Sequence, residues 1–346
     1  MRYDDSYWKD VDDVIQCIPD HQELYGHSFF ISGGTGMIGS SLIEVLLEMN
    51  RKYQARISIV AGVRDTDKAK ERFLQTSDWE GLSFVQYDAL SDFQLDFDPD
   101  FIIHGAGNAH PSFFVTEPVE TMISQLNGLN VLLKAAAERK GIRRVLYISS
   151  GEVYGRKNDE FPYSEENYSY VDILNPRASY PSAKRAGETL CAAYGNEYGV
   201  DTVIVRPGHI YGPGITDSDS RASAVFSRNA RNSEPIIMKS SGLQKRSYMY
   251  SLDCVSAILT VLVKGEKGQA YNLSNPASVV TIREMAEAFA KAGSVEILYE
   301  DPSDQEVLGY NLMDHSILNS EKLRSLGWKG CFDLEKGTAA TLRYLK

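Results

Sequence analysis

One short segment constrains the fold of this chain more than any other: Ile31-Ser32-Gly33-Gly34-Thr35-Gly36-Met37-Ile38-Gly39. An apolar run at residues 27–31 predicts a buried strand before it, and apolar residues at helical spacing over 38–49 predict a helix after it. Glycines at such a junction permit a tight turn, close approach of the backbone to a ligand, and close packing of the helix on the strand. The segment satisfies both Gly-x-Gly-x-x-Gly and Gly-x-x-Gly-x-x-Gly, spacings that place the pyrophosphate of a dinucleotide at a helix N-terminus. We therefore expect a dinucleotide-binding loop rather than a glycine-rich turn without a ligand.

The chain that follows alternates between apolar runs and helical periods. Strands are predicted at residues 57–63, 83–87, 101–104 and 145–148, and a long helix at 119–139. This alternation predicts an α/β fold, a doubly wound parallel Rossmann sheet with a smaller mixed C-terminal domain. We expect an N-terminal extension over 1–27, a dinucleotide-binding domain over 28–206 with 247–273, and a substrate-binding domain over 207–246 with 274–346. The extension should form one amphipathic helix that packs on the domain surface or on a second subunit.

The ends of the predicted strands carry the expected cofactor contacts, because ligands of such sheets bind beyond the carboxyl ends of the strands. The second strand ends at Arg64, where NAD-specific proteins place an acid for the ribose 2′-hydroxyl. An arginine there pairs with the 2′-phosphate of NADP, so the sequence modestly favours NADP over NAD. His104 is expected to be a packed core side chain. The residues expected to contact the cofactor are Gly33, Thr35, Gly36, Met37, Ile38, Gly39, Arg64, Asp88, Ala89, Gly105, Ala106 and Gly107.

Tyr180 and Lys184 lie four residues apart on a predicted helix over 180–198, so they share one face. A nearby ammonium group stabilises a phenolate, and we expect Lys184 to lower the pKa of Tyr180 and make it a base. Ser150 follows the fifth predicted strand, with Glu152 two residues further along. A lone Tyr-x-x-x-Lys is common by chance, but its combination with the glycine loop and Ser150 predicts catalysis.

The overall composition narrows the expected partners and the compartment. The 346 residues carry a formal net charge of −11 at pH 7, which argues against nucleic acid. The acidic N-terminus does not resemble a signal peptide, and the longest apolar run, 255–263, is too short to span a membrane. The four cysteines, Cys17, Cys191, Cys254 and Cys331, are far apart and form no Cys-x-x-Cys, which argues against a disulfide framework or a zinc site. We expect a cytoplasmic protein with no metal and no membrane partner.

Several motifs together resemble the nucleotide-sugar epimerase/dehydratase group of extended short-chain dehydrogenases/reductases, over nearly all of residues 28–346. They are the glycine loop, Ser150 to Gly155, Tyr180 with Lys184, Val205-Arg206-Pro207, Tyr211-Gly212-Pro213, Gln244-Lys245-Arg246-Ser247-Tyr248 and Leu326-Gly327-Trp328. Within this group, Ser-x-Glu-Val-Tyr-Gly and Asn-Pro-Arg-Ala-x-Tyr most resemble UDP-glucuronate decarboxylases. The chain departs from the group at two positions. Gln125 stands where many members have Asn, and Gly151 stands where decarboxylases have Ser and glucose 4,6-dehydratases have Asp.

The resemblance implies roles for particular residues. Tyr180 would take a proton from a sugar hydroxyl, Ser150 would hydrogen-bond that oxygen, and Lys184 would contact the nicotinamide ribose, with Tyr180 and Pro207 also at the cofactor. Arg221 and Arg246, with the polar segment 215–219, would hold the diphosphate of a nucleotide-sugar substrate. Glu152 would act after oxidation, either as a base at C5 or by orienting a uronic acid. The group also implies a homodimer built from the helices over 119–139 and 180–198.

Three functions are compatible with the sequence. The first is a nucleotide-sugar enzyme that acts through a 4-keto sugar and decarboxylates, epimerises or dehydrates it. The second is an NADP-dependent carbonyl reductase, and the third is a non-catalytic dinucleotide-binding protein. The trio of Ser150, Tyr180 and Lys184 argues against the third, and Arg246 favours the first over the second. We expect decarboxylation of a nucleotide-linked uronic acid, because Gly151 cannot protonate a departing hydroxyl.

Overall fold

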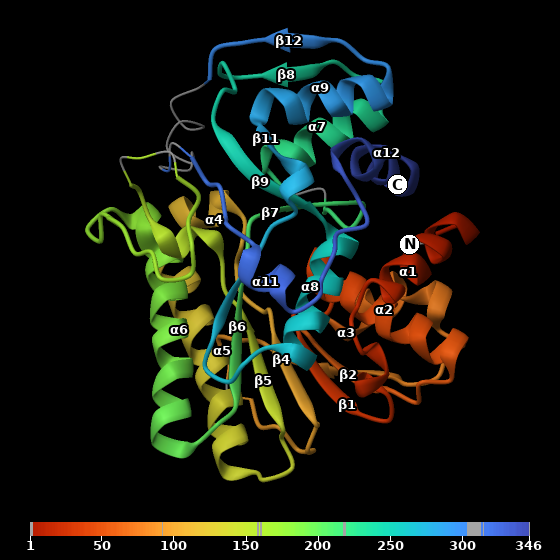
Figure 1. Ribbon diagram of the computed structural model, residues 1–346, viewed down its shortest axis with the longest axis vertical. Helices are drawn as coiled ribbons and strands as arrows, with labels where there is room; N and C mark the ends of the chain where they lie inside the picture. Colours follow the sequence, from red (N-terminus) through yellow and green to blue (C-terminus); the bar gives the residue numbers. More distant parts are fainter. Residues whose placement is uncertain are drawn as a thin grey trace.

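A seven-stranded parallel sheet with strand order β10-β6-β5-β4-β1-β2-β3 forms the centre of the molecule (Figure 1). The computed structural model describes residues 3–91, 93–157, 159, 161–216, 219–302, 313 and 315–345. The five strands predicted from the sequence are confirmed, with ends within one residue of the expected positions. The strands of this sheet are β1 (Ser28–Ser32), β2 (Ser58–Val63), β3 (Leu82–Gln86), β4 (Phe101–His104), β5 (Arg144–Ile148), β6 (Thr202–Pro207) and β10 (Ala270–Leu273).

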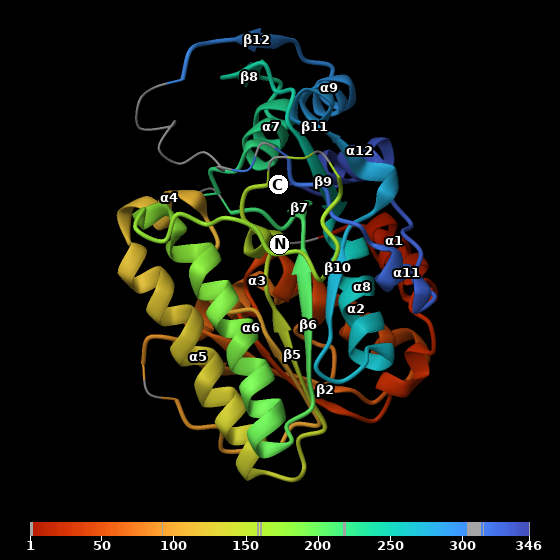
Figure 2. The same cartoon turned by 60° about the vertical axis from the view of Figure 1, so that its left-hand side comes forward.

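Helices cover both faces of this sheet, which is why its strands are apolar on both sides. Figure 2 shows α5 (Pro118–Glu138) and α6 (Ser179–Tyr198) side by side on one face, with α2 (Met37–Tyr53) and α8 (Ser251–Lys264) on the other. Successive residues of one strand therefore enter different cores. Phe30 packs with the leucines of α5, whereas Phe29 and Ile31 pack with α2 and α8.

A smaller lobe lies beyond the carboxyl ends of the central strands (Figure 1). It contains a three-stranded sheet, β11-β9-β7, a two-stranded sheet, β12-β8, and three helices that contact one another. The predicted α/β class, with a doubly wound parallel sheet and a smaller mixed C-terminal part, is therefore confirmed. The elements of this lobe are β7 (His209–Tyr211), α7 (Ala222–Arg231), β8 (Ile236–Met238), β9 (Lys245–Tyr250), β11 (Val279–Thr281), α9 (Ile282–Gly293), β12 (Ile297–Tyr299) and α12 (Leu334–Tyr344).

Short helical elements complete the chain. The α-helices are α3 (Thr66–Arg72), α4 (Pro111–Thr116) and α11 (Glu321–Ser325). The 3-10 turns are η1 (His21–Leu24), η2 (Leu74–Thr76), η3 (Gly151–Tyr154), η4 (Pro176–Ala178) and η5 (Pro276–Ser278). Within the described ranges, no helix is long and apolar enough to cross a bilayer. The apolar run 255–263 lies in α8, which has 14 residues.

The N-terminal extension packs on its own chain. Its helix, α1 (Asp5–Gln16), buries Val11, Val14 and Ile15 and contacts both α2 and α8. Tyr7 also meets Tyr344 of α12 edge to face, with ring centroids 5.2 Å apart. The extension thus contacts both the helices of the large sheet and the small lobe. Of the two locations that the sequence allowed, it occupies the surface of its own chain.

The cysteine spacing argues against a disulfide framework, but the structure contains a disulfide between Cys17 and Cys331. Cys17 follows α1 and Cys331 precedes α12, and the two sulfurs are bonded although the residues lie 314 positions apart in the sequence. The spacing of the cysteines along the chain does not reveal this pair. The two residues meet because α1 packs against the small lobe. Cys191 and Cys254 are buried free thiols.

Candidate active site

The glycine loop connects β1 to α2 and is shaped by the absence of side chains. Gly33 has a φ of +78°, a conformation that favours glycine, and its carbonyl accepts a hydrogen bond of 3.0 Å from the Gly36 amide. A Cβ atom on Gly39 would lie only 2.2 Å from the Gly33 oxygen. Gly36 precedes α2 and provides no side-chain cap for the first turn. The N-terminus of α2 thus faces the loop with backbone amides, as a pyrophosphate site requires.

A second loop, after β4, lies directly against the glycine loop. The amide of Gly105 donates to the Ser32 carbonyl at 3.2 Å, and a Cβ on Gly33 would lie 3.0 Å from the Ala106 nitrogen. Gly107 has a φ of +144°, and the amide group of Gln125 occupies the space where its Cβ would be. Gln125 also donates to the Asn108 carbonyl at 3.3 Å. Gln125, which stands where many members of the resembled group have Asn, therefore supports the loop after β4 through this hydrogen bond.

The fourth predicted strand ends as expected at a packed histidine. His104 is fully buried, its Nδ1 lies 2.7 Å from the Ser32 Oγ, and burial lowers its pKa to about 3. It therefore holds β4 to β1 as a neutral side chain.

The residues that follow β2 and β3 differ in their exposure and in their hydrogen-bond partners. Arg64 is exposed, whereas Asp65 caps the N-terminus of α3 and lies 3.6 Å from the Lys68 ammonium. Both residues are exposed, but the Asp65 carboxylate is engaged as the cap of its own helix. Asp88 is half-buried and accepts a hydrogen bond from the Leu90 amide, while Ala89 is buried.

The fold brings the predicted catalytic trio together at the carboxyl end of β5. The Ser150 Oγ accepts a hydrogen bond from the Glu152 amide at 3.1 Å and is also hydrogen-bonded to the Tyr180 hydroxyl. The Lys184 Nζ donates to the Ile148 carbonyl at 2.7 Å and lies 5.7 Å from the centre of the Tyr180 ring. Tyr180 and Lys184 are both buried on the same face of α6, as their spacing predicts.

The electrostatics of this trio differ from the expectation that Lys184 lowers the pKa of Tyr180. Burial and, to a smaller extent, the Glu152 carboxylate raise the pKa of Tyr180 to about 12. The hydrogen bond from Ser150 and the positive charges of Arg221 and Arg177 act in the opposite direction. Burial also lowers the pKa of Lys184 to about 7, because its ammonium is removed from water. The cations that most favour ionisation of Tyr180 are therefore the two arginines.

Arg177 is a site residue that the sequence analysis did not single out. Its Nη1 and Nη2 donate to the two oxygens of Glu152 at 3.1 and 3.2 Å, and its side chain is 6% exposed. The guanidinium also lies 4.7 Å over the ring of Phe114 from α4, which stacks on Tyr180 at 4.4 Å. The signal available in the sequence was an arginine three residues before the tyrosine, in Asn-Pro-Arg-Ala-x-Tyr.

Arg221 and Arg246, the two arginines expected to bind the substrate, each form polar contacts with other residues of the chain. Arg221 pairs with Asp219 at 2.6 Å, and Asp219 also lies 3.5 Å from the Nδ1 of His110. Burial alone would raise the pKa of Asp219, but hydrogen bonds from His110 and Arg221 hold it well below its usual range. Arg246 is buried and donates to the carbonyl oxygens of Lys245 and Met313 at 3.0 and 2.9 Å. Of the expected polar segment 215–219, residues 217 and 218 lie outside the described residues.

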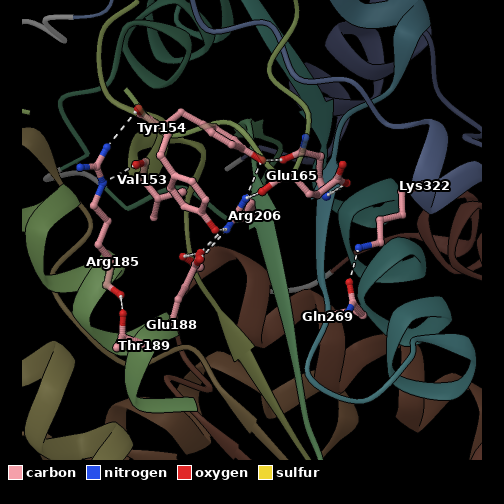
Figure 3. A network of polar contacts seen from close by, with 12 residues as sticks. Val153, Tyr154, Glu165, Arg185, Glu188, Thr189, Arg206, Gln269 and Lys322 are labelled. Atoms are coloured by element: carbon pink, nitrogen blue, oxygen red, sulfur yellow. Dashed lines mark hydrogen bonds and ion pairs between the residues drawn. The ribbon is translucent and has the colours of Figure 1, made fainter. Parts of the chain in front are cut away.

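A network around Arg206 fixes the elements that carry these groups (Figure 3). Arg206 pairs with Glu188 of α6 at 2.6 Å and donates to the Tyr154 hydroxyl at 2.9 Å. Arg185 donates to the carbonyls of Val153 and Tyr154 at 2.6 and 3.1 Å. Both arginines therefore hold η3 against α6, so that Ser150 faces Tyr180. Glu188 lies one turn beyond Lys184, a spacing that could have identified it.

The end of β6 closes the site beside Gly151. A Cβ at position 151 would lie 3.3 Å from both the Pro207 carbonyl and the Leu318 side chain. An acidic side chain at this position would therefore need its neighbours to move.

The geometry is that of a dinucleotide loop followed by a Ser–Tyr–Lys trio, and comparison with known proteins agrees. The profile of the NAD dependent epimerase/dehydratase family matches residues 29–274. The chain belongs to this family. UDP-glucuronic acid decarboxylase 1 of Xenopus tropicalis is 28% identical over 323 residues, which cover 91% of this chain and 71% of the relative.

Other members of the epimerase/dehydratase family are similarly related. The dTDP-D-glucose 4,6-dehydratase of Mus musculus is 27% identical over 334 residues, covering 91% of this chain and 88% of that protein. The crystal structure of UDP-glucuronic acid 4-epimerase from Bacillus cereus, in complex with UDP-glucuronic acid and NAD, superposes with a TM-score of 0.75. That structure covers 92% of this chain and 98% of its own, with 19% identity, so it supports the fold. Relatives thus include decarboxylases, dehydratases and epimerases.

Proposed function

We propose that this protein converts a nucleotide-linked uronic acid to a decarboxylated product through a 4-keto sugar. The proposal rests on the Glu152–Arg177 ion pair beside Gly151. A 4-keto uronic acid is a β-keto acid, so it can lose CO2 without a base at C5. Dehydration instead needs removal of the C5 proton and protonation of a departing hydroxyl.

The Glu152–Arg177 pair argues against dehydration for a physical reason. Both oxygens of Glu152 accept charge-assisted hydrogen bonds from one buried guanidinium. Protonating this carboxylate would break part of that ion pair, which makes Glu152 poorly suited to remove the C5 proton. Gly151 supplies no acid for the leaving hydroxyl. Decarboxylation needs neither function.

Each member of the trio then has a defined task. Tyr180 takes the proton of the C4 hydroxyl, and Ser150 hydrogen-bonds the same oxygen as it becomes a ketone. A nicotinamide cofactor supplies the hydride acceptor when bound. Glu152, held by Arg177, presents carboxylate lone pairs that can orient a sugar hydroxyl. After CO2 leaves, the electron pair of the broken bond remains at C5 and is captured by a proton. Return of the hydride to C4, with Tyr180 giving its proton back to the oxygen, then restores the hydroxyl, so that the product differs from the substrate by CO2 alone.

The residues present fit such a cofactor. The 2.2 Å separation between a Gly39 Cβ and the Gly33 oxygen means that only glycine permits this close packing of loop and helix. Gly33, Gly36 and Gly39 with Thr35, Met37 and Ile38 would hold the pyrophosphate, and Lys184 the nicotinamide ribose. The remaining proposed contacts are Asp88, Ala89, Gly105, Ala106, Gly107, Tyr180 and Pro207.

We favour NADP over NAD as the cofactor, although the family description and the Bacillus cereus structure name NAD. Arg64 supports this preference, because it is exposed at the end of β2 while the neighbouring Asp65 caps α3. A guanidinium there can pair with a 2′-phosphate.

The proposed diphosphate ligands of the substrate are Arg221 and Arg246. The side chain of Arg221 is 30% exposed, so the geometry supports it more than it supports the buried Arg246. Arg246 binds the Met313 carbonyl and would act mainly by holding that segment at the site.

A homodimer through α5 and α6 is the proposed assembly. These helices pack together on the outside of the sheet, and α5 exposes Val119, Met122 and Ile123 while α6 exposes Tyr198. Sedimentation velocity at several protein concentrations measures this association, and a monomer at every concentration would contradict it.

Epimerisation at C4 is the second candidate, because the same Glu152–Arg177 pair is compatible with it. In that reaction the 4-keto sugar turns over and is reduced again, and no acid is needed at position 151. Mass spectrometry of the purified protein with UDP-, CDP-, GDP- and dTDP-sugars distinguishes the two. Decarboxylation yields a product lighter by one CO2, whereas epimerisation yields a product of unchanged mass.

A further inference from the structure

Arg177 stands out because it contacts two parts of the site at once. Its two Nη atoms bind Glu152 of η3, and the face of its guanidinium covers Phe114 of α4. Phe114 is 1% exposed and stacks on the Tyr180 ring at an interplanar angle of 14°. Arg177, Phe114 and Tyr180 therefore form a continuous stack next to the Glu152 carboxylate.

The charges around Tyr180 come from several elements. Glu152 lies on η3, Arg177 on η4, Arg221 precedes α7, and Lys184 lies one turn along α6. The phenol of Tyr147 on β5 also interacts electrostatically with Tyr180, and the Lys184 Nζ lies 4.8 Å from the centre of the Tyr147 ring. Each arginine is paired with one carboxylate, Arg177 with Glu152 and Arg221 with Asp219. Loss of Arg177 alone would leave the negative charge of Glu152 unbalanced beside the hydroxyl that must lose a proton.

We infer that Arg177 is a positioning residue that fixes Glu152 as a hydrogen-bond acceptor and balances its charge, so that Tyr180 can act as the base. This inference rests on the proposed function, because that function assigns proton removal to Tyr180. The fork of the guanidinium positions Glu152, since it reaches both carboxylate oxygens while its plane stays on Phe114, and its charge balances that of the carboxylate. A lysine would supply the charge without the second hydrogen bond.

The test is the pH dependence of the first hydride transfer in the holoenzyme. Protein loaded with oxidised cofactor is mixed with UDP-glucuronate, or with UDP-glucose if that sugar alone is oxidised, and reduced nicotinamide is followed by absorbance in a single turnover. The rising limb of this profile reports ionisation of the base. In Arg177→Gln the limb moves to higher pH, so that the rate at a fixed pH on the limb falls about tenfold. The rate at the high-pH plateau is largely recovered.

Companion variants separate charge balance from general damage. Glu152→Gln moves the limb to lower pH, and the double variant Arg177→Gln/Glu152→Gln returns it close to the wild-type position. Arg177→Lys keeps the wild-type position because the charge is retained. The matched control is Arg185→Gln, which removes hydrogen bonds to η3 carbonyls but no contact with Glu152. It leaves the limb in place, even if it lowers the rate at every pH.

Several results would overturn the inference. A folded Arg177→Gln variant whose rate falls equally at all pH values assigns Arg177 a purely structural role. If that variant does not fold, an unshifted Glu152→Gln profile has the same consequence. Oxidation of UDP-glucose alone contradicts the uronic-acid substrate but leaves the Arg177 test intact. If neither sugar is oxidised, both proposals fail.

Discussion

Among the glycines of the loop, Gly39 is the one at which an added methyl group comes closest to a neighbouring atom, so Gly39→Ala should damage the loop. The new Cβ would lie 2.2 Å from the Gly33 oxygen and 2.9 Å from its carbonyl carbon. Real Cβ contacts are at least 3.0 Å, so α2 and the loop must separate by about 0.8 Å. Such overpacking costs about 1–3 kcal/mol of unfolding free energy. In a chain of 346 residues, whose unfolding entropy is large, that lowers Tm by roughly 1–4 °C.

The displaced loop should also bind the dinucleotide at least about tenfold more weakly, because the amides at the N-terminus of α2 move with the helix. Thermal unfolding and calorimetric titration with NAD and NADP measure the two effects. The matched control is Gly195→Ala within α6, where a Cβ finds only an ordinary 3.5 Å contact with the Val200 oxygen. That variant should be as stable as the wild type or more stable by about 0.5–1 kcal/mol. Unchanged cofactor affinity in Gly39→Ala would refute the assignment of this loop.

Three further predictions address the site and the fold. Tyr180→Phe should keep the fold and cofactor binding but lose about 10²–10⁴-fold in turnover, and near-normal turnover would remove Tyr180 as the base. Arg64→Ala should weaken NADP binding about tenfold and leave NAD binding unchanged; tighter NAD binding in the wild type, unaffected by Arg64→Ala, would reverse the cofactor preference. Burial raises the pKa of Glu44, which accepts a hydrogen bond from Tyr7, to about 7. In the unfolded chain Glu44 has the ordinary pKa of a glutamate, which is lower. Between the two pKa values the folded state keeps a proton that the unfolded state releases, so the free energy of unfolding falls as pH rises through this range, by about 3 kcal/mol in total. Glu44→Gln should remove this slope in denaturant unfolding, and an identical slope in both proteins would contradict it.

Local patterns were sufficient for the central sheet and its loop. Each strand from β1 to β5 is a short apolar run, and the glycines that follow β1 have a spacing with a direct geometric meaning. Tyr180 and Lys184 were also predictable, because four residues make one helical face. The capping box of α9, Thr281 with Glu284, could likewise be read from adjacent residues and is present.

Contacts between distant segments could not be predicted in this way. Glu152 and Arg177 are 25 residues apart and meet only because η3 and η4 both flank the N-terminus of α6. Cys17 and Cys331 meet because α1 packs against the small lobe, so a count of cysteines and their spacing pointed the wrong way. The pKa of Tyr180 also depends on burial and on two arginines from other elements, which periodicity does not reveal.

Incubation of the purified protein with UDP-glucuronate, with mass spectrometry of the nucleotide sugars, tests the central claim most directly. Samples with no added cofactor, with NAD and with NADP distinguish an internal redox cycle from net oxidation. Tyr180→Phe serves as the inactive control. The account predicts a nucleotide pentose lighter than the substrate by one CO2. Recovery of UDP-glucuronate without loss of CO2, together with conversion of a neutral nucleotide hexose, would contradict it.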